Sequence, residues 1–359
     1  MAITVIIAGC ADITPRSRDG ESYSMVIFSK GNPEGVACYR IPSLVTAPNG
    51  DLIAVADERV PSCGDLKWSR DINLVIRRSS DNGRSWSATE KVVDFPDGQS
   101  ASDPSMIVDE ITGDIFLFYN YMDHDREKDV YYLHYVRSSD NGKTWSSPID
   151  ITDQITTTEW KYDFKFITSG RGTQLRSGRL LHTIVNLEKG LHLFGSDDHG
   201  NSWFLIDSPI KPADESIVTE LTDGTLMVNS RVNGAGMRYV HTSGDGGFTW
   251  ETEPDTMLPD PGCNAGLIRY TQPGNRKPGR QLLFINANSP TSRENITLQT
   301  SSDEGNTWNE IATIYKGSAA YSAITVMKRG SVGILYERND YGEIVFTTNA
   351  GTRPGSRRP

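Results

Sequence analysis

The chain has 359 residues, a length compatible with about two ordinary domains or one large closed β-architecture. Its formal net charge is −10, and because no part of it offers a basic stripe, nucleic acid is excluded as a partner. No stretch approaches the ~20 apolar residues of a membrane-spanning helix, so we expect no membrane span.

The first predicted segment, residues 1–34, is an N-terminal arm or a leading strand. Residues 7–10 resemble the end of a bacterial lipoprotein signal, but the positively charged region that precedes such a signal is missing. A trimmed signal and a simple leading strand therefore both remain open for this segment.

Several segments after residue 34 are predicted to be β-strands, because they are rich in β-branched and aromatic residues. They are residues 73–76, 115–119, 130–136 and 282–285. Turn sequences at residues 49–52 and 223–226 indicate hairpins between such strands. No long segment has a helical period, and the one helix that we expect is short, near residues 161–166.

One motif, Ser-x-Asp-x-Gly-x-Ser/Thr-Trp, recurs along the chain at intervals of roughly 50–60 residues, which indicates a repeat architecture. Its five copies occupy residues 79–86, 138–145, 196–203, 243–250 and 301–308. The Asp can bond the backbone downstream of it, the Gly can adopt a positive φ, and the Trp can anchor the turn. Each copy is therefore predicted to be the corner of a hairpin.

Repeat units of this size, each holding several strands, are typical of a radial propeller. We predict an all-β fold: a six-bladed β-propeller of four-stranded antiparallel blades over residues 35–350. The blade count rests on length, because no sixth copy of the motif is present. Residues 351–359 are predicted to be a disordered tail.

The four cysteines match no zinc-binding pattern, and they are too few to form a disulfide framework that stabilises a chain of this length. We expect them to be free and buried. Cys38 and Cys63 could pair if neighbouring strands bring them together, which the sequence alone does not decide.

The repeated motif resembles the Asp box, and residues 39–42, Tyr-Arg-Ile-Pro, resemble the segment that opens the catalytic domain of sialidases (neuraminidases). The resemblance to the bacterial members of this family extends from about residue 35 to residue 340. It implies a sialidase-like propeller and a retaining exo-sialidase that hydrolyses terminal α-linked sialic acid through a tyrosyl-enzyme intermediate.

The resemblance implies that Arg40, Arg231 and Arg293 hold the carboxylate of sialic acid. Arginine suits this role because it stays charged and can offer two parallel donors to a carboxylate. Arg293 is the least securely matched of the three, because its surroundings are loosely patterned.

By the same resemblance, Tyr321 is the nucleophile and Glu215 is its base. A neutral phenol suits attack beside a substrate carboxylate, which would repel a carboxylate nucleophile. A phenol has a pKa near 10, so a hydrogen-bonded glutamate is needed to accept its proton. Glu220 is the alternative candidate for the base. It stands directly before the strand at Leu221, however, and this position favours a structural role.

The acid that protonates the leaving oxygen is Asp65 by resemblance, with Asp71 as a nearby competitor. Glu337 matches a family glutamate that supports the first arginine. Arg59 and Asp103 match positions that bind the O4 hydroxyl of the sugar, although an ordinary salt bridge explains each of them nearly as well.

The implied partners are sialylated glycoproteins, glycolipids and oligosaccharides, and the chemistry requires no metal or cofactor. We expect a monomer located outside the cell or in the bacterial envelope or periplasm, where such glycans are met. Two alternatives remain. One is a non-catalytic Asp-box lectin. The other is a trans-sialidase, which transfers sialic acid to an acceptor, or an intramolecular trans-sialidase, in which a hydroxyl group of the sialic acid itself attacks in place of water. A lectin would have no reason to keep Tyr321, Glu215 and Asp65 together.

Overall fold

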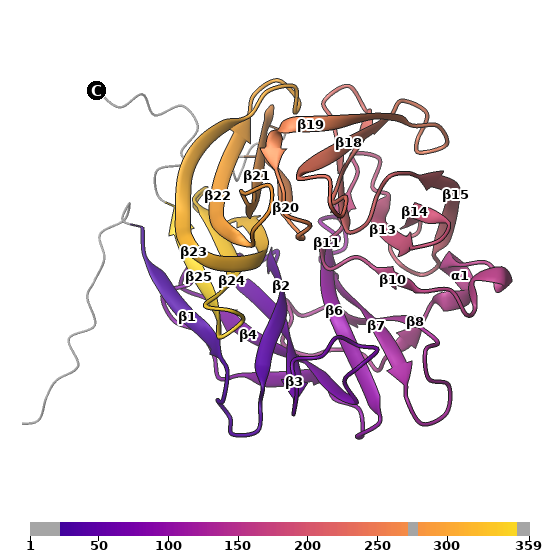
Figure 1. Ribbon diagram of the computed structural model, residues 1–359, viewed down its shortest axis with the longest axis vertical. Coiled ribbons are helices and arrows are strands. Elements are labelled where there is room, and N and C mark those ends of the chain that lie inside the picture. Colours follow the sequence, from indigo (N-terminus) through magenta and orange to yellow (C-terminus); the bar gives the residue numbers. More distant parts are fainter. Residues whose placement is uncertain (1–21, 272–278, 350–359) are drawn as a thin grey trace, which may run out of the picture.

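A computed structural model describes residues 22–271 and 279–349, and Figure 1 shows their mostly antiparallel sheets arranged around a central axis. The predicted tail at residues 351–359 and the signal-like residues 7–10 lie outside the described residues. Among the described residues, no helix is long and apolar enough to cross a membrane.

Four sheets each contain four or five strands. The first is β2 (Cys38–Thr46), β3 (Leu52–Val60), β4 (Asp71–Ser79) and β5 (Glu90–Val93). The second is β11 (Gly170–Arg171), β6 (Gln99–Val108), β7 (Ile115–Asp123), β8 (Tyr132–Ser138) and β9 (Ile149–Asp150). The third is β10 (Lys165–Ile167), β13 (Leu180–Asn186), β14 (Gly190–Ser196) and β15 (Phe204–Ile210), with β12 (Thr173–Gln174) beside β13. The fourth is β16 (Ser216–Glu220), β17 (Leu226–Ser230), β18 (Met237–Ser243) and β19 (Glu251–Pro259).

The fifth sheet has seven strands and joins the two ends of the described chain. Its order is β1 (Ser24–Ser29), β25 (Glu343–Asn349), β24 (Val332–Arg338), β23 (Asn309–Val326), β22 (Glu294–Ser301), β21 (Gln281–Ala287) and β20 (Gly266–Tyr270). The long strand β23 pairs with β22 through its first half and with β24 through its second half. The first strand, β1, pairs with the last, β25. The fold is therefore all-β and propeller-like, as the repeat predicts.

The five Asp-box copies connect the third and fourth strands of successive repeats, and they share the same hydrogen bonds. In the second copy the Ser138 hydroxyl accepts the Gly142 N–H at 2.9 Å and donates to Asp140 at 2.9 Å. The Asp140 carboxylate then accepts the N–H and the hydroxyl of Thr144, at 2.9 and 2.6 Å. Equivalent bonds are present in the other four copies. The prediction that each copy forms a tight corner is confirmed.

The predicted helix at residues 161–166 is wrong, because the helical turns lie earlier, at α1 (Thr152–Ile155) and at a 3₁₀ turn, Thr158–Trp160. Residues 165–167 instead form β10, whose backbone pairs with β13. The buried ammonium group of Lys165 donates to the carbonyl oxygens of Trp160 and Lys161, which fixes the turn before the strand.

Around the central axis, β2 contacts β6 and β23, β20 contacts β23 and β16, and β16 contacts β13. One end of this axis holds a cavity of about 940 Å³, lined in part by Thr46, Val108 and Glu220. These residues lie at or near the ends of β2, β6 and β16. Arg40 lies near the beginning of β2, toward the opposite end of the axis.

The packing of the Asp-box corners predicts that alanine substitutions at two of their glycines destabilise the protein by different amounts. A Cβ at Gly200 (φ +78°) would lie 2.3 Å from ring atoms of Phe116, whereas a Cβ at Gly246 (φ +82°) would meet nothing within 4 Å. We expect Gly200→Ala to lower the free energy of unfolding by about 3 kcal/mol, from strain and overpacking combined. Gly246→Ala should cost only about 1 kcal/mol, from backbone strain alone. Equal losses in urea unfolding would contradict this packing of the corner.

Candidate active site

Five of the residues that the resemblance singles out come from five different places in the fold. Arg40 lies on β2, Tyr321 on β23 and Glu337 on β24, whereas Glu215 directly precedes β16 and Arg231 directly follows β17. Side-chain contacts join these residues into two connected networks, which meet at Tyr321.

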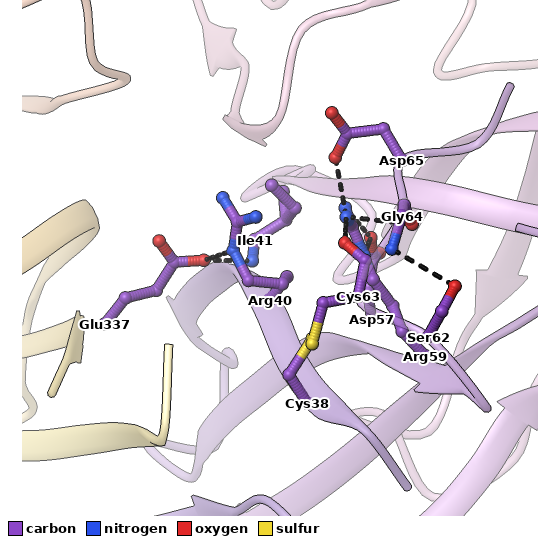
Figure 2. Close-up of a disulfide and its surroundings, with 10 residues drawn as sticks. All are labelled: Cys38, Arg40, Ile41, Asp57, Arg59, Ser62, Cys63, Gly64, Asp65 and Glu337. Atoms are coloured by element: carbon purple, nitrogen blue, oxygen red, sulfur yellow. Dashed lines mark hydrogen bonds and ion pairs between the residues drawn. A yellow bond between two sulfur atoms is a disulfide. The ribbon is translucent and has the colours of Figure 1, made fainter. Parts of the chain in front are cut away.

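The first network is centred on Glu337, which is completely buried. One of its carboxylate oxygens accepts the Arg40 Nε–H at 2.7 Å and the Ile41 backbone N–H at 2.8 Å, as Figure 2 shows. The other oxygen accepts the backbone N–H of Tyr321 at 3.1 Å. Glu337 therefore fixes Arg40 and Tyr321 relative to each other.

The local backbone at Arg40 is adapted to this contact. Ile41 has φ +57°, an uncommon conformation for a β-branched residue, and the pairing of β2 with β3 shifts register between Arg40 and Ser43. This irregularity points the Ile41 N–H away from the sheet ladder and toward Glu337.

The second network contains the hydroxyl group of Tyr321, which donates to the Glu215 carboxylate at 2.6 Å. Arg231 forms an ion pair with the same Glu215 oxygen and donates to the Tyr321 hydroxyl at 3.1 Å. All three side chains are buried or nearly so, with Glu215 and Tyr321 exposed by 5% and 8%. A phenol, a carboxylate and a guanidinium thus share one hydrogen-bonded cluster.

Burial is the main cause of the pKa shifts of Glu215 and Tyr321. It raises the pKa of Glu215 above its ordinary value, although Arg231 partly offsets the effect. Burial and the neighbouring Glu215 raise the pKa of Tyr321 well above 10. At neutral pH the phenol is therefore protonated, and Glu215 is placed to accept its proton.

The third predicted arginine, Arg293, lies just before β22 and completes a positive ring around Tyr321. The guanidinium carbons of Arg293 and Arg40 each lie 5.6 Å from the centre of the Tyr321 ring. Arg293 donates to the Gly262 carbonyl at 2.9 Å and to the Tyr341 hydroxyl at 3.1 Å. Within the described part of the chain, no carboxylate forms an ion pair with Arg293, so its charge is available to an anion.

Arg59 is enclosed by carboxylates. It donates to Asp57 at 2.8 and 3.1 Å and to Asp65 at 2.6 Å, and its side chain is 1% exposed. It also donates to the carbonyl oxygens of Cys63 and Gly64, so it holds the loop that carries Asp65 (Figure 2).

Asp65 extends into solvent at the edge of the site, with its side chain 76% exposed. Partial burial disfavours its carboxylate, but the Arg59 guanidinium more than offsets this and lowers the pKa of Asp65. In this conformation Asp65 is ionised at neutral pH. To act as an acid it must first separate from Arg59.

Asp103 has a positive φ of 62°, and its backbone N–H donates to Asp57 at 3.1 Å. Its carboxylate accepts from Asn120 at 3.1 Å. Burial, followed by the charge of Asp57, raises the pKa of Asp103 to about 8. Asp103 therefore holds a proton at neutral pH, next to the ion pairs of Arg59.

The two rival carboxylates are placed differently. Glu220 pairs with Arg176 at 3.1 Å and lines the cavity at the far end of the axis. Asp71 begins β4 and accepts a hydrogen bond from Asn73 at 2.9 Å. Neither is among the contacts of Tyr321 or Arg40 in the described residues.

The expectation that all four cysteines are free is wrong, because Cys38 and Cys63 form a disulfide with their Cα atoms 5.7 Å apart (Figure 2). Cys38 begins β2 opposite Arg59 of β3, and the loop after β3 turns back to bring Cys63 beside it. The bond therefore ties the Asp65 loop to the strand that carries Arg40. Cys263 is free and buried, as expected, and Cys10 lies outside the described residues.

Some residues of the site carry no recognisable signal in the sequence. Tyr341 contacts two of the three arginines, and Ser169 and Asn264 form a hydrogen-bonded pair next to Glu215. The sequence around Tyr341 indicates only a turn, at residues 339–342. Among residues 22–271 and 279–349, no group of three His, Cys, Asp or Glu side chains could hold a metal ion.

The amino-acid sequence also matches known proteins. Residues 44–334 match the family model of the BNR repeat-like domain. The chain is 36% identical to a sialidase of Micromonospora viridifaciens over 85% of its length and 50% of that protein, so it spans about half of this relative. It is 29% identical to a sialidase of Bacteroides fragilis, over 91% of the chain and 67% of that protein.

Solved structures show the same fold. The Hadza microbial sialidase Hz136 superposes with a TM-score of 0.81 at 31% identity, over 90% of this chain and 68% of that one. The intramolecular trans-sialidase of Ruminococcus gnavus superposes with a TM-score of 0.76 at 20% identity, over 91% and 98% of the two chains, which is a likeness of fold alone. The propeller and its repeated Asp-box corners thus define a BNR-repeat class of protein. The chain belongs to the bacterial-type sialidase family.

The Glu337 network predicts a large effect on stability. Glu337→Ala would leave Arg40 buried without its partner, so we expect the free energy of unfolding to fall by about 3–5 kcal/mol. The control is Glu90→Ala, which removes a surface pair with Arg78 and should cost less than about 1 kcal/mol. Urea unfolding checks both variants, and similar losses would show that Glu337 does not stabilise the buried centre.

Proposed function

We propose that this protein is a retaining exo-sialidase, which hydrolyses terminal α-linked sialic acid from glycoconjugates through a tyrosyl-enzyme intermediate. The observation that carries the proposal is the hydrogen bond of 2.6 Å from the Tyr321 hydroxyl to Glu215, inside a ring of three arginines. A phenol paired with a buried base has the form of an activated nucleophile.

The arginines would bind the carboxylate of sialic acid. Arg40 is held through Nε by Glu337, and no described residue accepts a hydrogen bond from its two terminal nitrogens. Arg293 adds a charge that no described carboxylate neutralises, and Arg231 completes the set. Two parallel donors and a guanidinium without a carboxylate partner suit the carboxylate of a substrate, even on a protein with a net charge of −10.

In the proposed first step, Glu215 takes the phenolic proton as the Tyr321 oxygen bonds to the anomeric carbon. The bond from that carbon to the leaving oxygen breaks, and Asp65 donates a proton to the leaving oxygen. In the second step, Asp65 takes a proton from water, whose oxygen bonds to the anomeric carbon. The Tyr321 oxygen then leaves and recovers its proton from Glu215.

Asp65 can supply that proton only after its ion pair with Arg59 is broken, because this pair lowers the pKa of Asp65. The proposal therefore includes a rotation of the exposed Asp65 side chain toward the leaving group. Arg59 and the protonated Asp103 form the polar wall that we assign to the O4 hydroxyl of the sugar.

We further propose that residues 35–350, together with β1 before them, form one catalytic domain with six blades. The support is β23, whose two halves pair with different strands, so the seven-stranded sheet divides into two four-stranded blades that share this strand. Strand β1 would supply the outer strand of the last blade, which explains why this blade needs no Asp-box corner.

A location outside the cytoplasm is also proposed. It is supported by the Cys38–Cys63 disulfide, because such bonds persist mainly in oxidising compartments. The partners there would be sialylated glycoproteins, glycolipids and oligosaccharides, bound by a monomer.

The proposal predicts that the wild type hydrolyses a fluorogenic sialoside and that Tyr321→Phe lowers kcat/KM by at least about 10³-fold. Tyr162→Phe is the matched control, because this tyrosine is 76% exposed and should leave kcat/KM unchanged. NMR of the product should show free sialic acid in its normal ring.

Three other outcomes would contradict the proposal in different ways. Activity that survives Tyr321→Phe would exclude the assigned nucleophile. An anhydro or acceptor-linked product would replace hydrolysis with transfer. A folded wild type that binds sialosides without cleaving them would indicate a lectin.

A further inference from the structure

Tyr341 lies in the turn between β24 and β25 and contacts two arginines of the site at once. Its ring packs under the guanidinium group of Arg40, with 3.8 Å from the guanidinium carbon to the ring centre. Its hydroxyl accepts a hydrogen bond from Arg293 Nη1 at 3.1 Å. Tyr341 also lines a pocket of about 340 Å³ together with Arg293 and Glu337.

The backbone of this turn is strained at the tyrosine. Asn339, Asp340 and Tyr341 have φ values of 54°, 50° and 64°, all in the left-handed region. Asn and Asp adopt this region comparatively readily, whereas a bulky aromatic residue does so only at a cost. The turn alone would therefore be more stable with a residue other than tyrosine at position 341.

Hydrogen bonds from β23 hold the turn in this conformation. Tyr315 donates to the Asn339 side chain at 2.9 Å, and Ser318 donates to the Asp340 side chain at 2.6 Å. The Asn339 N–H donates to the Ser318 carbonyl at 3.0 Å. A strained residue fixed by its surroundings in this way is characteristic of functional sites.

We propose that Tyr341 is a positioning residue that orients Arg40 and Arg293 for the carboxylate of the substrate. Glu337 holds Arg40 at Nε, and Tyr341 fixes the plane of the same guanidinium through its face, so only the terminal nitrogens remain free. The hydrogen bond to the Tyr341 hydroxyl fixes Arg293 in the same arrangement. This inference rests on the proposed function, in which these arginines bind the carboxylate.

If the two arginines are already oriented, the binding of a carboxylate does not have to order their side chains, and the entropy cost of binding is smaller. The substrate carries its carboxylate both before and during the reaction. The contribution of Tyr341 should therefore be largely the same in the ground state and in the transition state, and it should appear in KM more than in kcat.

Two variants separate the contacts of Tyr341. Tyr341→Phe keeps the ring under Arg40 and loses the hydrogen bond, and we expect KM to rise about 5-fold. Tyr341→Gly loses both contacts, and we expect KM and the inhibition constant of the sialic acid analogue DANA to rise about 50-fold, with kcat changed less than about 3-fold. Tyr162→Gly is the control for loss of an exposed tyrosine, and it should leave KM unchanged.

Thermal unfolding distinguishes positioning from a structural role. Because glycine adopts the left-handed region without strain, it offsets part of the packing that is lost with the partly buried ring, and Tyr341→Gly should lower the Tm by no more than about 5 °C. A large loss of Tm together with the rise in KM would mean that Tyr341 acts mainly by holding the fold, and this would overturn the inference.

The remaining outcomes separate this inference from the proposed function. Wild-type hydrolysis with unchanged KM and DANA inhibition in both variants would overturn only the inference. A wild type that binds DANA in calorimetry but hydrolyses no sialoside would overturn the proposed function, and the DANA affinity of the two variants would still decide the role of Tyr341. A wild type that neither hydrolyses the sialoside nor binds DANA would overturn both.

Discussion

The buried carboxylate of Glu337 is the contact on which the centre of this protein depends. It accepts hydrogen bonds from the Arg40 side chain, the Ile41 backbone and the Tyr321 backbone, and so joins β2, β23 and β24 where these strands meet at the axis. A buried arginine requires such a partner, because an unpaired charge in the interior is very unfavourable. The same carboxylate therefore stabilises the fold and sets the position of the proposed nucleophile relative to the first arginine.

Charge is distributed unevenly over the cluster, and this unevenness gives the site its chemical character. Arg40 and Arg231 are balanced by Glu337 and Glu215, and Arg59 is balanced by Asp57 and Asp65. Arg293 contacts only neutral groups among the described residues, so its positive charge is the one in this cluster that no adjacent carboxylate neutralises. The Cys38–Cys63 disulfide ties the loop of Asp65 to the beginning of β2, the strand that carries Arg40.

The features that depend on neighbouring residues could be predicted from the sequence. Each Asp box forms its corner with its own Ser, Asp and Gly, so the repeat was sufficient to predict the corners and the propeller-like fold. The features that depend on the path of a loop, on a side-chain conformation or on the exact length of a strand could not. The pairing of Cys38 with Cys63 follows from the path of one loop, the Asp65–Arg59 ion pair from a side-chain conformation, and the two-sided pairing of β23 from its length. Tyr341 reads as part of an ordinary turn, because its strained backbone and its contacts with two arginines exist only in the folded protein.

In the proposed mechanism Tyr321 becomes covalently bonded to the substrate, and trapping of this bond tests the mechanism most directly. The protein would be incubated with a difluorinated sialic acid, digested and analysed by tandem mass spectrometry, with Tyr321→Phe treated in parallel. The structure predicts one added sugar on the peptide that contains Tyr321, and none on the variant. An adduct on Glu215 or Asp65, or an equal adduct on the variant, would contradict the assignment of the nucleophile.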